Sequence, residues 1–252
     1  MKQSIYPVIN PGAYGWCHEH WTDTFYPEGL PAGRPEDDAE DWRLAYYSNQ
    51  FNAVLVPADY WYTGGVADCE NWLDDVHENF QFFVECRPDM LSYISLDELT
   101  EHLKKLQPQL SAVVFLSDRQ TRSDSGLQSA AELLTNQFDE LLDALQLSIF
   151  TPGLFIDSAM GSQAINVCWP DMQADQERKA ERPFPASFVF IENDLSDLRQ
   201  IRTMVENYVM QAGNTRQQAE KNVKESTIIV NHPQLQAADL SRFRAMLEIM
   251  GR

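Results

Sequence analysis

Short apolar runs alternate with amphipathic stretches along most of the chain. The runs Ala112–Leu116 and Thr227–Val230 are apolar at nearly every position, whereas a strand with one exposed face would alternate polar and apolar residues. Continuous runs are typical of strands that are covered on both faces, as in a parallel sheet. The expected strands are Ile5–Ile9, Ala53–Val56, Phe80–Cys86, Ala112–Leu116, Leu147–Phe150 or Leu154–Ile156, Ala164–Cys168, Ser187–Ile191 and Thr227–Val230.

Apolar residues at helical spacing fill the gaps between these runs. Ser95 and Glu98 have the spacing of a capping box, which predicts a helix that begins just after Ser95. The apolar stripes are expected to pack on a core rather than to hold a cofactor. They consist of Leu99, Leu103, Leu106 and Leu110; Leu134, Phe138, Leu141 and Leu145; Leu198, Ile201, Val205 and Tyr208; and Leu240, Phe243, Leu247 and Met250.

The repeated alternation of strand and helix predicts an α/β fold, a TIM-type (β/α)8 barrel that forms a single domain over residues 1–252. A doubly wound open sheet alternates in the same way, and the pattern alone does not separate the two. We expect a compressed or irregular second half, because little room remains for a helix between Phe150 and Ala164. The stretch Asn10–Asp41 is rich in Gly, Pro and aromatic residues and is expected to be an ordered loop.

Charge excludes several classes of partner. The chain has 19 Lys and Arg against 38 Asp and Glu, a formal charge of −19. This balance argues against nucleic-acid binding, which needs clustered basic residues, and against docking on anionic membranes. No apolar run approaches the roughly 20 residues of a membrane span, and the first residues lack a signal-peptide core. Four scattered cysteines fit reduced thiols in a cytoplasmic protein. Nothing in the sequence indicates the oligomeric state.

Several strings in the first third of the chain resemble one known family. They are Gly15-Trp16, Trp21, Phe25–Pro31 (FYPEGLP) and Asp41–Val54 (DWRLAYYSNQFNAV), followed by Trp72 and Phe80–Val84. Together they resemble the YecE-like proteins, the family called domain of unknown function seventy-two, over about residues 12–90. The resemblance implies a TIM-type barrel with a cleft at the C-terminal ends of its strands. It implies no settled activity.

The chain also departs from the pattern of that family. Leu55 stands where the family usually has a Glu, and Glu85 stands where it has a Lys on the third strand. The Arg and the His-Gly pair expected near the seventh strand are absent, and Asn231 alone resembles the Asn of the last strand. The resemblance therefore identifies a divergent member whose usual polar site is rewritten or lost.

Polar residues at the ends of the expected strands are candidates for chemistry, because strand ends of a barrel converge on one mouth. The catalytic candidates are Asp59, Glu85, Asp118 and Glu192, and the candidate ligands of a divalent metal are His20, Asp157 and His232. Carboxylates and imidazoles suit such a cation, and a carboxylate whose pKa is raised by like charges can act as a general base. The alternative is that acids after strands cap the next helix.

Aromatic residues gather near the same expected mouth. Trp16, Trp21, Tyr60 and Trp61, together with Asn231, are the candidate ligand-binding residues, because flat apolar walls with polar edges suit sugar-like rings. The alternative is that these aromatic residues pack the first loop and the strand ends over the barrel. The sequence contains no phosphate-binding glycine loop and no nucleophile elbow.

These observations predict a binding mouth for a small polar or sugar-like molecule at the C-terminal ends of the strands. The replaced family residues leave open whether the chain catalyses a reaction. The alternative function is a divalent-metal-assisted hydrolase or isomerase that uses the strand-end carboxylates. Fold analogy cannot choose between them, because barrels support many chemistries and some support none.

Overall fold

The computed structural model describes residues 8–31, 42–61, 69–87, 95–115, 148–156, 164–170, 187–191, 194–206, 209 and 225–251. Among these residues, no helix is both long enough and apolar enough to cross a membrane.

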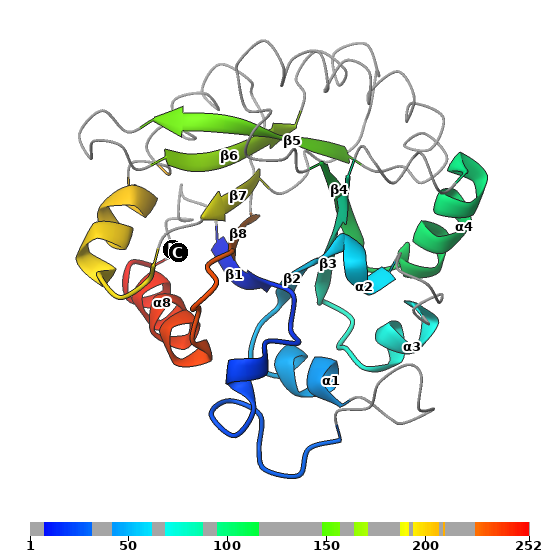
Figure 1. Cartoon of the computed structure of the whole chain (residues 1–252). Coiled ribbons are helices and arrows are strands. Elements are labelled where there is room, and N and C mark those ends of the chain that lie inside the picture. Colours follow the sequence, from blue (N-terminus) through cyan, green and yellow to red (C-terminus); the bar gives the residue numbers. More distant parts are fainter. Residues whose placement is uncertain are drawn as a thin grey trace, which may run out of the picture.

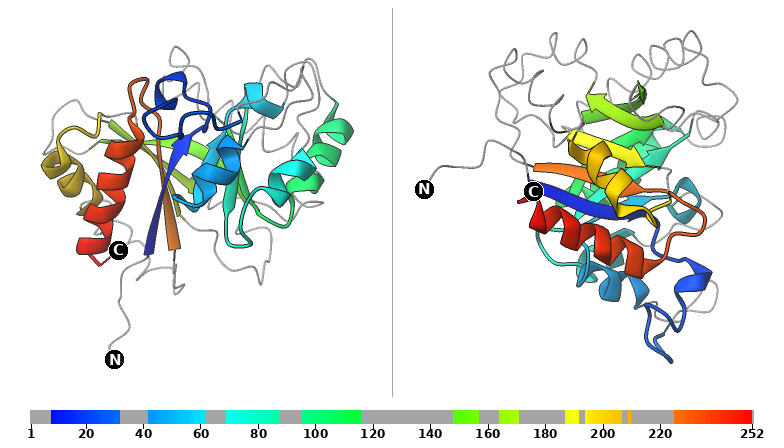
Figure 2. Two further views of the ribbon diagram at one scale, coloured as in Figure 1. Left: turned by 90° about the horizontal axis from the view of Figure 1, so that it is seen from below. Right: turned by 90° about the vertical axis from the view of Figure 1, so that its left-hand side faces the viewer.

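The regular part of the molecule is a curled sheet of five parallel strands, called the half-barrel below (Figure 1). In spatial order these are β8 (Glu225–Val230), β1 (Val8–Tyr14), β2 (Ala53–Val56), β3 (Gln81–Cys86) and β4 (Leu110–Phe115). Because neighbouring strands run in the same direction, their carboxyl ends lie along one edge of the half-barrel (Figure 2).

The parallel pairing breaks down at β6. β5 (Ser148–Ile156) pairs in parallel with β4, and β7 (Ser187–Ile191) pairs in parallel with β8. β6 (Ala164–Pro170) lies between β5 and β7 and runs antiparallel to both. The strands thus pair in a ring, but it is not a ring of eight parallel strands.

The prediction of a TIM-type (β/α)8 barrel is therefore wrong, because β6 runs antiparallel to both of its neighbours and the strands do not form eight parallel βα units. The connection between β5 and β6 spans only residues 157–163. A crossover to a parallel neighbour, its helix included, needs about 10–12 residues or more. The chain turns back instead, and β6 pairs antiparallel. The shortage of room after Phe150 was thus a signal for a reversed strand.

Helices cover the outside of the half-barrel (Figure 1). They are α1 (Arg43–Ser48), α3 (Cys69–Asp74), α4 (Leu96–Leu106) and α8 (Ala237–Ile249), with a further helical stretch over residues 198–206. The predicted capping box is confirmed, because the Ser95 hydroxyl accepts from the backbone N–H of Glu98 and the Glu98 carboxylate accepts from that of Ser95. Leu103 of α4 and Leu247 of α8 are buried, as their helical spacing predicts.

Each half-barrel strand places alternate residues in two separate apolar layers. The outer layer, between sheet and helices, includes Val54, Val84 and Val113. The inner layer, inside the half-barrel, consists of Ala53, Leu55, Phe83, Ala112, Val114 and Ile229, with Tyr14 packed against it. Both faces of the sheet are covered, so the continuous apolar runs are explained as predicted.

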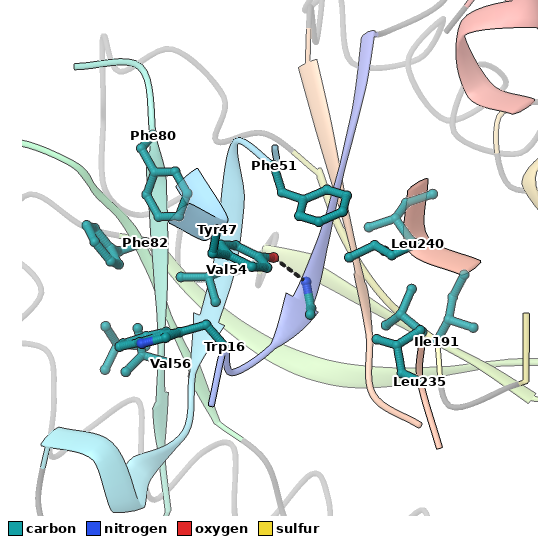
Figure 3. Packing of buried hydrophobic residues seen from close by; sticks show 14 of the residues in the cluster. Trp16, Tyr47, Phe51, Val54, Val56, Phe80, Phe82, Ile191, Leu235 and Leu240 are labelled. Atoms are coloured by element: carbon teal, nitrogen blue, oxygen red, sulfur yellow. Dashed lines mark hydrogen bonds between the residues drawn. The ribbon is translucent and has the colours of Figure 1, made fainter. Parts of the chain in front are cut away.

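The outer layer is rich in aromatic side chains (Figure 3). Tyr47 of α1 is its central polar contact: the hydroxyl accepts from the backbone N–H of Ala13 at 2.8 Å and donates to the carbonyl of Ala53 at 2.9 Å. The close approach of β1 to β2 also explains Gly12, since a Cβ there would lie 2.2 Å from the Ala53 carbonyl oxygen. Tyr47 therefore fastens the first two strands together.

Candidate ligand site at the carboxyl edge

Two polar side chains meet on the inner side of the half-barrel, near its carboxyl edge. Tyr14 is the last residue of β1, and Glu85 is the next-to-last residue of β3. Glu85 shares its face of β3 with Phe83, because side chains alternate along a strand. Its exposed fraction is only 5%, which is unusual for a carboxylate.

Two donors hold the Glu85 carboxylate in place. The Tyr14 hydroxyl donates to Oε2 at 2.6 Å, and the backbone N–H of Ala58 donates to the same oxygen at 2.8 Å. Every hydrogen bond that the described residues make to this side chain goes to Oε2, so the second oxygen, Oε1, is left for another donor. A carboxylate in this arrangement can accept hydrogen bonds from a ligand or take a proton from it.

Glu85 also anchors the short helix α2 (Ala58–Trp61), which follows β2. The Trp61 indole N–H donates to the Glu85 backbone carbonyl at 3.1 Å, in addition to the bond from Ala58. On the other side of α2, the Tyr60 hydroxyl accepts from the backbone N–H of Cys17 at 3.2 Å. The loop after β1, the helix after β2 and the end of β3 are therefore joined at one place.

The tyrosine of this pair keeps its proton. Burial raises the pKa of Tyr14 far above its usual range, and the negative charge of Glu85 and its hydrogen bond raise it further. The charge of Asp59 acts in the same direction, and that of Arg87 opposes it. At neutral pH Tyr14 is therefore a neutral hydroxyl whose proton points to Glu85.

A more exposed ion pair, between Arg87 and Asp59, lies near Tyr14 and Glu85. Arg87 follows β3, and its Nη2 lies 2.6 Å from Oδ1 of Asp59 in α2. The two side chains are 35% and 62% exposed, so solvent screens their attraction, and such pairs contribute about 0–1 kcal/mol. Below, the Glu85 site means Tyr14, Ala58, Asp59, Glu85 and Arg87.

Trp61 and Tyr60 belong to α2 beside this site and Trp16 packs on Tyr60, but all three predicted tryptophans are buried. Trp16 and Trp61 are 4% and 3% exposed, and Trp21 is fully buried in the outer layer. Trp16 packs edge-to-face on Tyr60 with ring centroids 5.0 Å apart, and Tyr60 is half-buried. This geometry favours packing over open walls for the three tryptophans, and their ligand-binding role stays a prediction.

The predicted histidines and Asn231 lie in loops after β1 and β8. Nε2 of His20 donates to the Leu235 carbonyl at 2.6 Å, next to the Trp21 indole N–H, which donates to the same oxygen at 2.7 Å. His232 Nδ1 accepts from the backbone N–H of Gln234, and the Asn231 backbone N–H donates to Ile191. The two bonds to Leu235 hold the loops after β1 and β8 together.

Of the predicted carboxylates, the structure brings Asp59 and Glu85 to one site. Asp118, Asp157 and Glu192 lie outside the described residues. In the part of the chain that is described, no three His, Cys, Asp or Glu side chains gather closely enough to hold a metal ion. The metal set of His20, Asp157 and His232 therefore stays a prediction.

Sequence reasoning missed Tyr14 and Arg87. The expected first strand ended at Ile9, because Pro11 and Gly12 indicated a loop. The structure continues β1 through both residues to Tyr14. The sequence signal for the longer strand is Gly15, which directly follows Ala13-Tyr14. In the structure Gly15 has a φ of +77°, and the strand ends before it. Arg87 was signalled only by its position two residues after Glu85, which is the spacing of one strand face.

Known proteins give the chain a family. The profile of the family described as protein of unknown function DUF72 matches residues 11–250. A DUF72 family protein from Thermotoga maritima has a similar structure, with 14% sequence identity, a TM-score of 0.54 and coverage of 96% of this chain and 99% of that one. A DUF72 family protein from Enterococcus faecalis gives 12% identity and a TM-score of 0.45, with 95% of each chain covered.

No curated protein matches the chain significantly. The likeness to the Thermotoga maritima protein, at this low identity, shows a shared fold. The family profile covers nearly the whole chain and agrees with the strings noted in the first third of the sequence. The chain therefore belongs to DUF72, the YecE-like family.

Proposed function

We propose that the carboxyl edge of β1, β2 and β3 binds a small polar molecule against Glu85. The observation that carries this proposal is a carboxylate that is 5% exposed and held by the Tyr14 hydroxyl and the Ala58 N–H on one oxygen only. An ionised group in the interior has a large desolvation cost. Apolar residues would fill the same space without that cost, as Leu55 and Val114 do beside it.

The place of Glu85 in the fold supports the same function. Ligands of parallel α/β sheets bind at the carboxyl ends of the strands, where loops from several strands meet. Here the loop after β1, helix α2 and the end of β3 contact one another through Tyr60 and Glu85. Exposure increases from Glu85 to Arg87 and then to Asp59, so the approach from solvent lies on the side of this ion pair.

The test is a panel of small polyols, sugars, amines and organic acids, screened by thermal shift and by ligand-observed NMR. Three proteins are compared: the wild type, Glu85→Gln and the matched control Glu78→Gln, whose glutamate is exposed in the turn before β3. A ligand at about 100 times its Kd should stabilise the wild type and the control by about 2.7 kcal/mol. Glu85→Gln should lose most of this stabilisation. A panel with no hit that depends on Glu85 contradicts the proposal.

A further inference from the structure

We infer that the molecule bound at the Glu85 site presents a cationic nitrogen, such as a primary ammonium, to Oε1 of Glu85. This inference rests on the proposed function and specifies its ligand class. Three features of the site lead to it: the direction of its hydrogen bonds, its net charge and the apolar surface below it.

At the Glu85 carboxylate the hydrogen bonds leave an acceptor and not a donor. The Tyr14 proton and the Ala58 N–H are both directed to Oε2. What remains at the carboxylate for a ligand is Oε1 of Glu85. A ligand therefore needs its own N–H or O–H groups, and an ammonium group supplies three of them and no acceptor.

The charges favour a positive donor over a neutral one. The described side chains of the Glu85 site carry two carboxylates and one guanidinium, a net charge of −1. Arg87 donates to Asp59, so its positive charge mainly offsets the negative charge of that residue. Burial is the main cause of the raised pKa of Tyr14, and the charges of Glu85 and Asp59 raise it further because both oppose a second negative charge. The net negative charge therefore favours the binding of a cation at this edge and opposes the binding of an anion.

The surroundings strengthen this preference. Leu55, Phe83 and Val114 lie fully buried in the inner layer, and Tyr14 packs against that layer. Hydrogen bonds and charge attraction are stronger beside such apolar surface than in water. Because the inner layer fills the space below the carboxylate, the ligand group that reaches Oε1 comes from the edge and is small. A single ammonium on a short carbon chain meets these conditions.

The test uses three molecules of nearly equal size that differ in charge: 2-aminoethanol as the cation, ethylene glycol as the neutral molecule and glycolate as the anion. Dissociation constants are measured by NMR titration of the full chain at pH 7 and constant ionic strength. We expect 2-aminoethanol to bind about ten-fold more tightly than ethylene glycol, because a hydrogen bond to a charged partner is stronger than a neutral one.

Variants separate this inference from the proposed function. Glu85→Gln should abolish the preference for the cation, and Glu78→Gln should keep it. Asp59→Asn leaves the buried carboxylate intact and should reduce the preference several-fold, which keeps the test open if Glu85→Gln fails to fold. Equal or tighter binding of ethylene glycol or glycolate overturns the ligand class but not the binding function. Failure of 2-aminoethanol to bind also overturns the ligand class, whereas failure of every compound in the wider panel overturns both.

Discussion

Tyr47 is buried and Tyr14 is partly buried on the same half-barrel, and their hydroxyls have different partners. Tyr47, in the outer layer, bonds to the backbone of β1 and β2, and Figure 3 shows the bond to β1. Tyr14, at the carboxyl edge, donates to the carboxylate of Glu85. Burial raises the pKa of both hydroxyls, but for Tyr14 the charge of Glu85 is a second cause. The carboxyl edge thus combines a partly buried hydroxyl with a buried carboxylate.

This difference distinguishes the outer layer, which stabilises the fold, from the Glu85 site, which we propose binds a ligand. A hydroxyl that satisfies two backbone groups removes polar atoms that would otherwise be unpaired, which stabilises the fold directly. A buried carboxylate that accepts from a hydroxyl keeps its desolvation cost even when it is well bonded. We therefore expect variants of the outer layer to change stability, and variants of the Glu85 site to change binding with little effect on stability.

The largest effect is expected from Trp21→Ala. Trp21 is fully buried, stacks on Tyr47 with ring centroids 6.2 Å apart and donates to the Leu235 carbonyl. Its removal should lower the free energy of unfolding by about 3–5 kcal/mol, measured by urea denaturation. Trp42→Ala is the control, since Trp42 is 51% exposed, and it should have a much smaller effect. If Trp21→Ala had normal stability but lost ligand binding, Trp21 would instead be a ligand-binding residue, as the sequence analysis predicts.

The pH dependence of stability tests the same layer. The His18 ring lies 4.3 Å from that of Trp21, and burial lowers the pKa of His18 from 6.5 to about 4, with the charge of His20 as a smaller cause. Between these two values the unfolded chain binds a proton that the folded chain does not. Stability therefore decreases as the pH falls from about 7 to 4, by about 3 kcal/mol from this residue.

Urea denaturation at several pH values measures this effect. His18→Gln should remove that part of the pH dependence, whereas His77→Gln, at an exposed position, should leave the curve unchanged. If the wild type and His18→Gln lose stability in parallel as the pH falls, His18 is not the group that titrates.

Much of this outer layer could be predicted from the sequence, because it depends on local patterns. The helical spacing of Leu99, Leu103 and Leu106 and the capping box at Ser95 are properties of one segment, and the structure confirms them. The reversed direction of β6 could have been derived from the length of the β5–β6 connection. The repeated alternation of strands and helices instead favoured a barrel of eight parallel strands. The spacing of apolar residues identifies a strand, but it does not show whether that strand runs parallel or antiparallel to its neighbours.

The candidate site was harder to predict, because it depends on contacts between distant residues. Glu85 was identified from its position at a strand end, but Tyr14, its partner, is 71 residues away and follows a proline and a glycine that suggested a loop. Asp59 was expected among the catalytic carboxylates, and the structure pairs it with Arg87. Nothing local to Trp16 or Trp61 distinguishes a buried tryptophan from a ligand wall, because both have the same residue type at a strand end.

A smaller loss of stability is expected from Tyr47→Phe. Without the hydroxyl, the N–H of Ala13 and the carbonyl of Ala53 lose their partner in the dry outer layer. The free energy of unfolding should fall by about 1–3 kcal/mol. Tyr46→Phe, in the same helix but half-buried, is the matched control and should change it by less. Ligand binding should be unaffected in both, and a selective loss of binding in Tyr47→Phe would contradict the separation of scaffold from site.

The smallest effect on stability is expected from Glu85→Gln, although this variant should abolish binding. The amide oxygen of Gln can still accept from Tyr14 and Ala58, while the desolvation cost of a buried charge is removed. The gain and the loss nearly cancel, so the free energy of unfolding at pH 7 should stay within about 1 kcal/mol of the wild type. Urea denaturation beside Glu78→Gln measures the difference. A loss of about 3 kcal/mol or more would show that the carboxylate serves mainly to clamp α2 to β1 and β3, and the carboxyl edge would then belong to the scaffold.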